Sequence, residues 1–202
     1  METLDGREIN DMTVFLPKSV PPQLQNLKKI EIGFHSSLEV VFDDQGLKVN
    51  KEGHREVLAA HAKLEEVSLI SLPKLRLVWR KGPHAIQVPF QNLSLLCVRD
   101  CPSLTRVFTP SMAKVLVRLQ SVEIENCKNL KAIVAEEEEE EECPVAGGIL
   151  FPQLTRLSLV EVPKLLAVTP KPYSFKWSSL KFVNLGHCGM LQETANDTLQ
   201  VC

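Results

Sequence analysis

Aromatic residues are scarce in this sequence, and long apolar runs are absent. Phe, Trp and Tyr make up 5% of the 202 residues, so a folded core has to be built mainly from leucine and valine. No apolar run approaches the roughly 18 residues of a transmembrane helix, and the opening METLDGREIN lacks the features of a secretory signal. We expect a soluble, cytoplasmic protein.

Motifs of catalysis, nucleotide binding and metal binding are missing as well. The sequence has no GxxxxGK[ST] or GxGxxG loop, no HExxH or GxSxG motif and no CxxC pair. His54 and His61 lie seven residues apart without a third ligand nearby, which favours a solvated helix face over a metal site. His187 and Cys188 are adjacent, and adjacent strand residues point to opposite sides of a sheet, which argues against a catalytic pair. We expect no enzymatic activity, no metal and no cofactor in this chain.

A basic stripe with interleaved aromatic residues, which is typical of nucleic-acid binding, is not found either. Lysines and arginines are scattered along the sequence. The sequence therefore disfavours a nucleic-acid partner.

What the sequence contains is a repeated pattern of apolar residues at relative positions 1, 4, 6, 12 and, with one exception, 15. Positions 4 and 6 alternate with polar neighbours, as in a short half-buried strand, and positions 12 and 15 bring the chain back beneath it. One such unit cannot bury its own apolar side, so the units must stack. The pattern predicts an α/β leucine-rich-repeat solenoid, with a curved parallel sheet on the concave face and irregular or short-helical returns on the convex face. The six copies begin at Leu27, Leu64, Leu93, Leu119, Leu154 and Leu180.

These copies set the expected boundaries. We assign residues 27–194 to the six repeats and residues 195–202 to a tail, because the last apolar slot of the sixth copy is Thr194. Residues 14–20 resemble Val107–Met112, the tail of a repeat. We therefore expect residues 1–26 to form a partial, uncapped repeat that starts without its strand half. On that expectation the chain is the end of a longer protein or a truncated product.

Positions 9 and 10 are expected to form the turn after each strand. Proline at position 10 has no N–H for a ladder, so it ends the strand. A cysteine at position 9 is small and has a weak S–H donor, which suits a buried site beside turning carbonyls. Cys101 and Cys127 could approach disulfide distance in an oxidising setting, but we expect free thiols in the cytosol. The residues concerned are Cys101, Cys127 and Cys188, and Pro73, Pro102 and Pro163.

Three segments between the repeats stand out. The spacing of apolar residues and histidines within Asp43–Lys63 predicts an amphipathic helix on the back of the solenoid. Thr109 followed by Pro110 predicts an N-cap and the first residue of a short outer helix that leads into Ala113–Arg118.

The third segment is an acidic insert at residues 135–148, which contains seven consecutive glutamates, Glu136–Glu142. Like charges repel, so we expect it to be extended and disordered. Without the run, the remaining 18 acidic residues face 23 basic ones, and the net charge changes from −2 to +5. The run is interpreted as a solvated loop. The alternative is an acidic segment that docks onto a basic surface of a neighbouring domain.

Side chains at positions 3, 5, 7 and 8 would form the open face of the sheet. Ile70, Leu95, Val160 and Phe182 are apolar there, which is typical of a contact surface, although single exposed apolar residues are common. Six strands about 4.8 Å apart give a patch of roughly 300 Å² in projection. A partner in a specific interface contributes about 800 Å², so contact would need the inserts or further repeats. The candidate protein-binding residues on this concave face are Lys29, Glu31, Phe34, Glu66, Ser68, Ile70, Leu95, Arg99, Asp100, Glu123, Glu125, Arg156, Ser158, Val160, Phe182, Asn184 and His187.

Several blocks of the sequence resemble the repeats of a known family. FQNLSLLCVRDCPSLTRVF (Phe90–Phe108), TPSMAK (Thr109–Lys114), LQSVEIENCKNLKAIV (Leu119–Val134) with its glutamate tail, and FPQLTRLSLVEVPKLLAV (Phe151–Val168) are similar to the repeats of plant nucleotide-binding leucine-rich-repeat (NB-LRR) disease-resistance proteins of the coiled-coil class. The resemblance covers about residues 14–191. It is specific in the combination of Cys-Pro-x-Leu, the TPSMAK helix and the acidic insert.

This resemblance implies a non-catalytic protein-interaction module of an intracellular receptor of plant innate immunity. Such repeats help to detect pathogen effectors, directly or through a guarded host protein, and hold the nucleotide-binding domain inactive. The implied partners are therefore an effector, a guarded host protein or that domain. The ATP/ADP switch of the family belongs to a P-loop domain, so we expect no nucleotide ligand in this chain. Alternatives are a free-standing repeat protein, an enzyme of unrecognised type, or a substrate adaptor of a ubiquitin ligase. The adaptor would need an F-box-like helical segment before the repeats, and Met1–Thr13 is too short for one.

Overall fold

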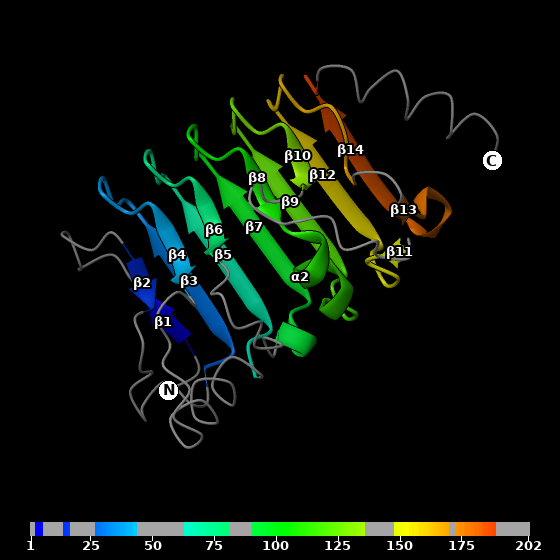
Figure 1. The fold of residues 1–202 in the computed structure, drawn as a ribbon, viewed down its shortest axis with the longest axis horizontal. Helices are drawn as coiled ribbons and strands as arrows, with labels where there is room; N and C mark the ends of the chain where they lie inside the picture. Colours follow the sequence, from blue (N-terminus) through cyan, green and yellow to red (C-terminus); the bar gives the residue numbers. More distant parts are fainter. Residues whose placement is uncertain are drawn as a thin grey trace.

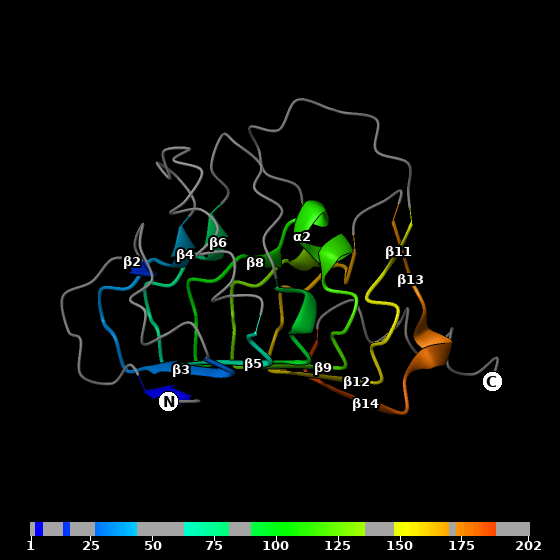
Figure 2. The same ribbon diagram turned by 90° about the horizontal axis from the view of Figure 1, so that it is seen from below.

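The protein is a stack of parallel strands in two layers (Figures 1 and 2). The computed structural model describes residues 3–5, 14–16, 27–43, 63–80, 90–135, 148–169 and 173–188. The first sheet has seven strands in the order β1-β3-β5-β7-β9-β12-β14. Their bounds are β1 Thr3–Asp5, β3 Lys29–Gly33, β5 Glu66–Ile70, β7 Leu95–Arg99, β9 Ser121–Glu125, β12 Arg156–Val160 and β14 Phe182–Gly186.

All six predicted copies place a strand at positions 3–7 of the repeat pattern, and equal positions pair across neighbouring strands. Val67 of β5 lies opposite Leu96 of β7, and Leu69 lies opposite Val98. These four side chains, at positions 4 and 6, are buried. Because a shift of one residue would turn every one of them outward, their burial fixes the register of the stack. The prediction of a parallel leucine-rich-repeat solenoid is confirmed.

The first residues of the chain correct one interpretation. β1 pairs with β3, with Thr3 opposite Lys29, and β2 (Val14–Leu16) pairs with β4 (Val40–Asp43), with Val14 opposite Val40. These pairings set Thr3 at position 3 and Val14 at position 14 of a further copy. The expectation that residues 1–26 start without a strand half is therefore wrong. The pattern missed this copy because Gly6 stands at position 6, where the other copies have Ile, Leu or Val.

A second parallel sheet lies behind the first, in the order β10-β8-β6-β4-β2 (Figure 2). Its other strands are β6 (Leu77–Arg80), β8 (Arg106–Phe108) and β10 (Ala132–Val134). The expectation of irregular or short-helical returns is wrong for these copies. The residues at positions 14–16 are mostly β-branched, large aliphatic or aromatic, as in Val40-Val41-Phe42, and such residues favour extended backbone.

Helical structure among the described residues is limited to short segments. The helix α2 spans Pro110–Val115, and the N–H of Met112 donates to Oγ1 of its N-cap, Thr109, at 3.4 Å. The predicted cap and first helical proline are confirmed, and the helix ends at Val115 because Leu116 leaves helical geometry. Two 3₁₀ turns, η2 (Phe90–Asn92) and η3 (Trp177–Ser179), precede the strands of their repeats, and β11 (Ile149–Leu150) pairs with β13 (Ser174–Phe175).

Aromatic rings fill part of the space between the two sheets. The ring centroids of Phe42 and Trp79 are 4.6 Å apart, and Phe90 meets Trp79 edge-on at 3.9 Å. Further along the stack, Phe108 and Phe151 are 5.6 Å apart. Phe42 and Trp79 stand at position 16 of the first and second copies, and Phe90 stands three residues before position 1 of the third. The repeat pattern omitted both of these buried positions.

The turn after each strand contains the predicted buried cysteines. Cys101, Cys127 and Cys188 are fully buried free thiols. The Cys101 thiol donates to the carbonyl of Arg99 at 3.3 Å, and the Cys188 thiol donates to that of Leu159 at 2.8 Å. The structural role predicted for position 9 is therefore confirmed.

Position 8 adopts a left-handed conformation in every predicted copy, with φ between 52° and 63°. Its N–H donates to the position-7 carbonyl of the next repeat, as from Phe34 to Ile70 at 3.0 Å and from Asp100 to Glu125 at 3.1 Å. Side chains other than glycine rarely adopt this conformation, and the stacking bond stabilises it in the first five copies. His187 adopts it at the end of the described sheet, beside the last strand, β14. The residues are Phe34, Ser71, Asp100, Asn126, Glu161 and His187.

Candidate interaction surface

The outward side of the first sheet carries the concave-face candidates. Every one of these candidate residues is half-buried or exposed. We call their surface the sheet face. Three neighbours at the same repeat positions, Gly33, Cys97 and Ser121, are instead buried. The sheet face is therefore accessible, and its binding role stays a prediction.

Charges in the first four repeats of the sheet face pair with one another. Lys29 lies 3.4 Å from Glu66, and Arg99 lies 3.6 Å from Glu123 and 3.5 Å from Glu125. Exposed pairs of this kind contribute little stability, about 0–1 kcal/mol each. Their main effect is to pair the basic side chains of this part of the surface, whose charge stays acidic overall.

The last two repeats present a different arrangement. The guanidinium carbon of Arg156 lies 4.3 Å from the ring centroid of Phe182, so the cation stacks on an aromatic face. Beside this pair, Asn184 donates to the Ser158 hydroxyl at 3.3 Å. Within the described part of the chain, no carboxylate lies within ion-pair distance of Arg156. This end of the sheet face thus offers a cation, an aromatic surface and an amide together.

The expected apolar contact residues differ in their exposure. Ile70, Leu95 and Val160 are half-buried, because neighbouring strands cover part of each side chain. Phe182 is 42% exposed and Phe34 is 64% exposed. The most exposed aromatic rings therefore lie in the first and sixth copies, at opposite ends of the sheet face.

Thiol chemistry is disfavoured at Cys97, Cys101 and Cys188, whereas the hydrogen bond with Cys101 lowers the pKa of Cys127. Burial raises the pKa of Cys97, and it raises the pKa of Cys188 to about 11. The neighbouring Cys127 thiol, together with burial, raises the pKa of Cys101. Since the thiolate is the reactive form, these side chains act as small core residues. The exposed His187 adjoins the buried Cys188, as expected for neighbours on opposite sides of a strand end.

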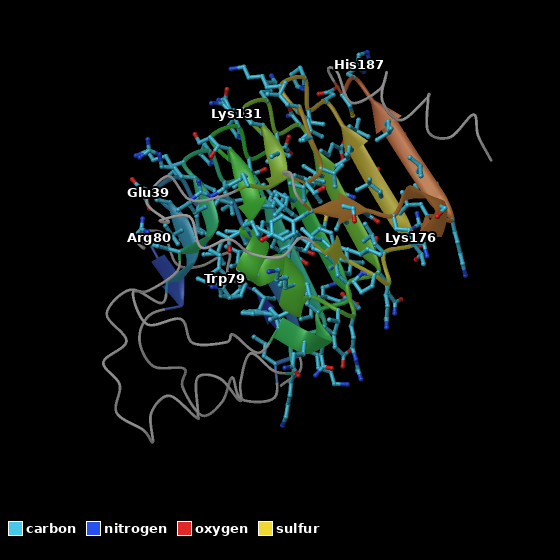
Figure 3. All side chains as sticks on the ribbon, turned by 45° about the vertical axis from the view of Figure 1, so that its right-hand side comes forward. Glu39, Trp79, Arg80, Lys131, Lys176 and His187 are labelled. Atoms are coloured by element: carbon cyan, nitrogen blue, oxygen red, sulfur yellow. The ribbon has the colours of Figure 1, made fainter. Side chains whose placement is uncertain are left out.

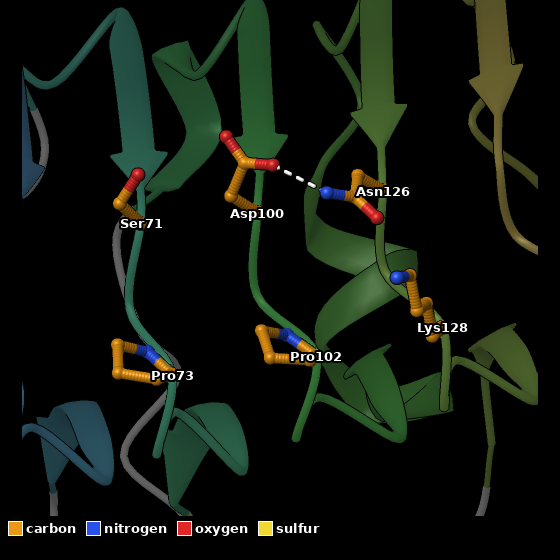
Figure 4. Close-up of a pocket in the computed structure, with 6 residues that line it drawn as sticks. All are labelled: Ser71, Pro73, Asp100, Pro102, Asn126 and Lys128. Carbon is orange, nitrogen blue, oxygen red and sulfur yellow. Dashed lines mark hydrogen bonds between the residues drawn. The ribbon is translucent and has the colours of Figure 1, made fainter.

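A second surface, which the sequence analysis missed, lies where the strands end (Figure 4). Residues at positions 8 and 10 of three consecutive repeats line a groove of about 410 Å³, which we call the turn groove. The Asn126 amide donates to the Asp100 carboxylate across it at 2.6 Å. The pattern of prolines at position 10 pointed to the turn but not to a groove, which only stacking creates. The lining residues are Ser71, Pro73, Asp100, Pro102, Asn126 and Lys128.

The other predicted features stay predictions. The described residues contain no group of three or more His, Cys, Asp or Glu that could hold a metal ion. No described helix is long and apolar enough to cross a membrane. The helix expected within Asp43–Lys63, with His54 and His61, the glutamate run and the tail at residues 195–202 lie outside the described residues.

Comparison with known proteins agrees with the repeat architecture. Residues 1–128 match the family described as plant disease resistance protein RPS2-like, leucine-rich repeats. No curated protein matches the chain. The match spans the added N-terminal copy, the first three predicted copies and the strand β9 of the fourth. The chain therefore belongs to the leucine-rich-repeat family of RPS2-like plant disease resistance proteins, whose repeats are protein-interaction modules of plant immunity.

Proposed function

We propose that this chain is the recognition and autoinhibition module of an intracellular NB-LRR immune receptor. Its sheet face binds a pathogen effector or a guarded host protein, and in the resting state it contacts the nucleotide-binding domain. The chain supplies contact surface only: ADP or ATP binds in the nucleotide-binding domain, and the module itself performs no chemistry.

The observation that carries this proposal is the stacked pair of Arg156 and Phe182. Arginine and aromatic residues dominate the binding energy of protein interfaces. Here they lie together on an accessible sheet, at the end where the charges are not already paired with each other. The neighbouring Ser158 and Asn184 provide hydrogen-bonding groups at the rim.

Autoinhibition can be tested in leaf cells. The chain is co-expressed with a coiled-coil and nucleotide-binding fragment of an RPS2-like receptor that causes cell death by itself. We expect the wild-type chain to suppress this death and to co-precipitate with the fragment. Arg156→Glu should reduce both effects at least tenfold, because it reverses the charge at the contact. Arg156→Lys keeps the charge but not the stacked plane, and should give an intermediate loss.

Circular dichroism of each purified variant checks that folding is unchanged, since Arg156 is exposed. A chain that neither binds the fragment nor suppresses cell death would overturn the autoinhibitory role. Equal activity of wild type and Arg156→Glu would show that binding uses a different surface.

A further inference from the structure

Charge is segregated between two surfaces of the solenoid. On the sheet side, positions 2–8 of the six copies contain seven acidic and five basic residues. At the turns and the start of the returns, positions 10–14 of copies one to five contain six basic residues, all in copies two to five, and one acidic residue, Glu39 of the first copy. These six residues are scattered along the sequence, but the stack gathers them on one edge, where Figure 3 labels Lys131. Five of them are exposed, and we call them the turn-edge cations: Lys74, Arg76, Lys128, Lys131 and Lys164.

The turn-edge cations differ from those on the sheet face in their partners. Lys28 and Lys29 each have a glutamate within 3.5 Å. Lys164 instead contacts a neutral amide, with its ammonium 2.7 Å from Oδ1 of Asn129. For the other four, the described residues offer no carboxylate within 4.0 Å. This edge therefore carries positive charge that the described part of the fold does not neutralise.

The turn groove adjoins this edge: Lys128 belongs to both, and Lys74 directly follows Pro73 of the lining. Figure 4 shows Pro73 and Pro102 one repeat apart on one side of the groove, and Ser71, Asp100 and Asn126 at the strand ends on the other. The prolines give it an apolar floor. The one acidic side chain in the lining, Asp100, already accepts a hydrogen bond from Asn126.

Hydrogen bonds between repeats hold the groove rigid. The Ser103 hydroxyl donates to the carbonyl of Pro73 at 2.6 Å, and the Asn129 amide donates to that of Pro102 at 2.8 Å. On the return side, the N–H of Lys131 donates to the carbonyl of Thr105 at 2.9 Å, which keeps position 13 in a column. A preformed groove loses little conformational entropy when it is filled, which favours binding.

The dimensions fit an extended polypeptide. Copies two to five span three steps of about 4.8 Å, or about 15 Å, which is the length of four to five residues at about 3.3 Å each. The column at position 13 continues from Lys131 to Leu166, whose side chain is 63% exposed. An acidic stretch that ends in an apolar residue would meet cations first and then this leucine.

Other anionic partners fit less well. Single-stranded nucleic acid binds by stacking its bases on aromatic side chains, and positions 10–14 of copies two to five contain no aromatic residue. An anionic membrane presents a broad, nearly flat charged layer, whereas the exposed cations here lie along one edge of the stack beside an apolar depression of about 410 Å³. The combination of an apolar groove with a flanking row of cations matches an acidic peptide.

We propose that the turn groove and the turn-edge cations form a second binding surface, which takes an extended acidic segment of a partner protein. This surface shares Asp100 with the sheet face, but its cations lie outside that face. The proposal therefore goes beyond the function proposed above and does not depend on what the sheet face binds.

The test is fluorescence anisotropy with the whole chain and a fluorescein-labelled peptide, Glu-Glu-Glu-Glu-Glu-Leu. Its counterpart with five glutamines is the neutral control. We expect the acidic peptide to bind at least tenfold more tightly than the neutral one, and its affinity to fall as salt is raised. The double variant Lys128→Glu/Lys131→Glu should weaken binding at least tenfold. The matched control Lys28→Glu/Lys29→Glu makes the same charge change on the sheet face and should alter affinity less than twofold.

Each other outcome overturns the proposal. Equal loss in both double variants would mean that only net charge matters. Tighter binding of a single-stranded oligonucleotide or of anionic lipid vesicles than of the peptide, with the same dependence on Lys128 and Lys131, would assign the surface to those ligands. A gain in affinity when Glu136–Glu142 are replaced by glutamines would show that the chain's own glutamate run occupies the groove.

Discussion

Replacing Val122 by aspartate should unfold the module. Val122 lies in β9 at position 4 of the fourth copy and is 1% exposed. Its neighbours on the adjacent strands are Leu96 of β7 and Leu157 of β12. Losing its apolar burial costs about 2 kcal/mol. The new carboxyl group has no hydrogen-bonding partner between stacked apolar strands, which adds about 2–7 kcal/mol. The sum is comparable with the whole stability of a domain, about 5–15 kcal/mol.

Urea denaturation followed by circular dichroism measures the effect. Glu123→Val is the matched control, since Glu123 is the next residue on the same strand and lies on the sheet face. It should change stability by about 1 kcal/mol or less, because it removes only an exposed ion pair with Arg99. If Val122→Asp kept a cooperative transition within about 1 kcal/mol of wild type, the inward assignment of position 4 would be wrong.

Three further predictions concern single positions. Burial raises the pKa of Cys188 from its ordinary value of 9.0 to about 11, so the folded state holds this proton more tightly than the unfolded chain does. The stability that this pKa difference contributes is complete below pH 9 and is lost as the pH rises towards 11. The urea midpoint of the wild type should therefore fall over this range, and that of Cys188→Val should fall less. Phe34 has φ 63° and is 64% exposed. Phe34→Gly should raise the melting temperature, because it relieves about 1 kcal/mol of backbone strain. A lower melting temperature would mean that the ring makes stabilising contacts. Arg99→Ala should lower stability by less than about 1 kcal/mol in low salt and by nothing measurable in high salt, and a large loss at both would show that its ion pairs are structural.

The strands of the first sheet could be predicted because their signal is local and periodic. Positions 4 and 6 must both point inward, and a wrong register would expose Val67 and Leu69 together. The same argument placed the cysteines, since position 9 follows directly from the strand. It also identified which side chains stay accessible on the sheet face. It did not reveal how those side chains pair, because Arg99 meets Glu125 only through a neighbouring repeat.

The features that could not be predicted depend on contacts between repeats. The left-handed residues at position 8 range from Phe34 to Asn126, and no side-chain preference unites them. In the first five copies their N–H bonds the next strand, which one repeat alone does not show. The second sheet and the aromatic stack escaped notice for a related reason. Position 16 keeps a fixed offset within each copy, but the pattern used only positions 12 and 15 of the return, and these two positions do not show the alternation of a strand. The contact between Phe42 and Trp79 forms only when two repeats stack.

The stacked architecture explains how one chain can present two surfaces of opposite charge. Positions 4, 6, 9 and 12 are committed to the core, so their side chains are constrained by every neighbouring repeat. Positions 3, 5 and 7 face one side, and positions 10, 11 and 13 face the turn edge, with few core contacts. A substitution such as Lys131→Glu or Arg156→Glu therefore changes what a surface attracts without changing how the repeats stack. Because the backbone bonds between repeats do not involve these side chains, each surface can change its partner independently of the other and of the fold.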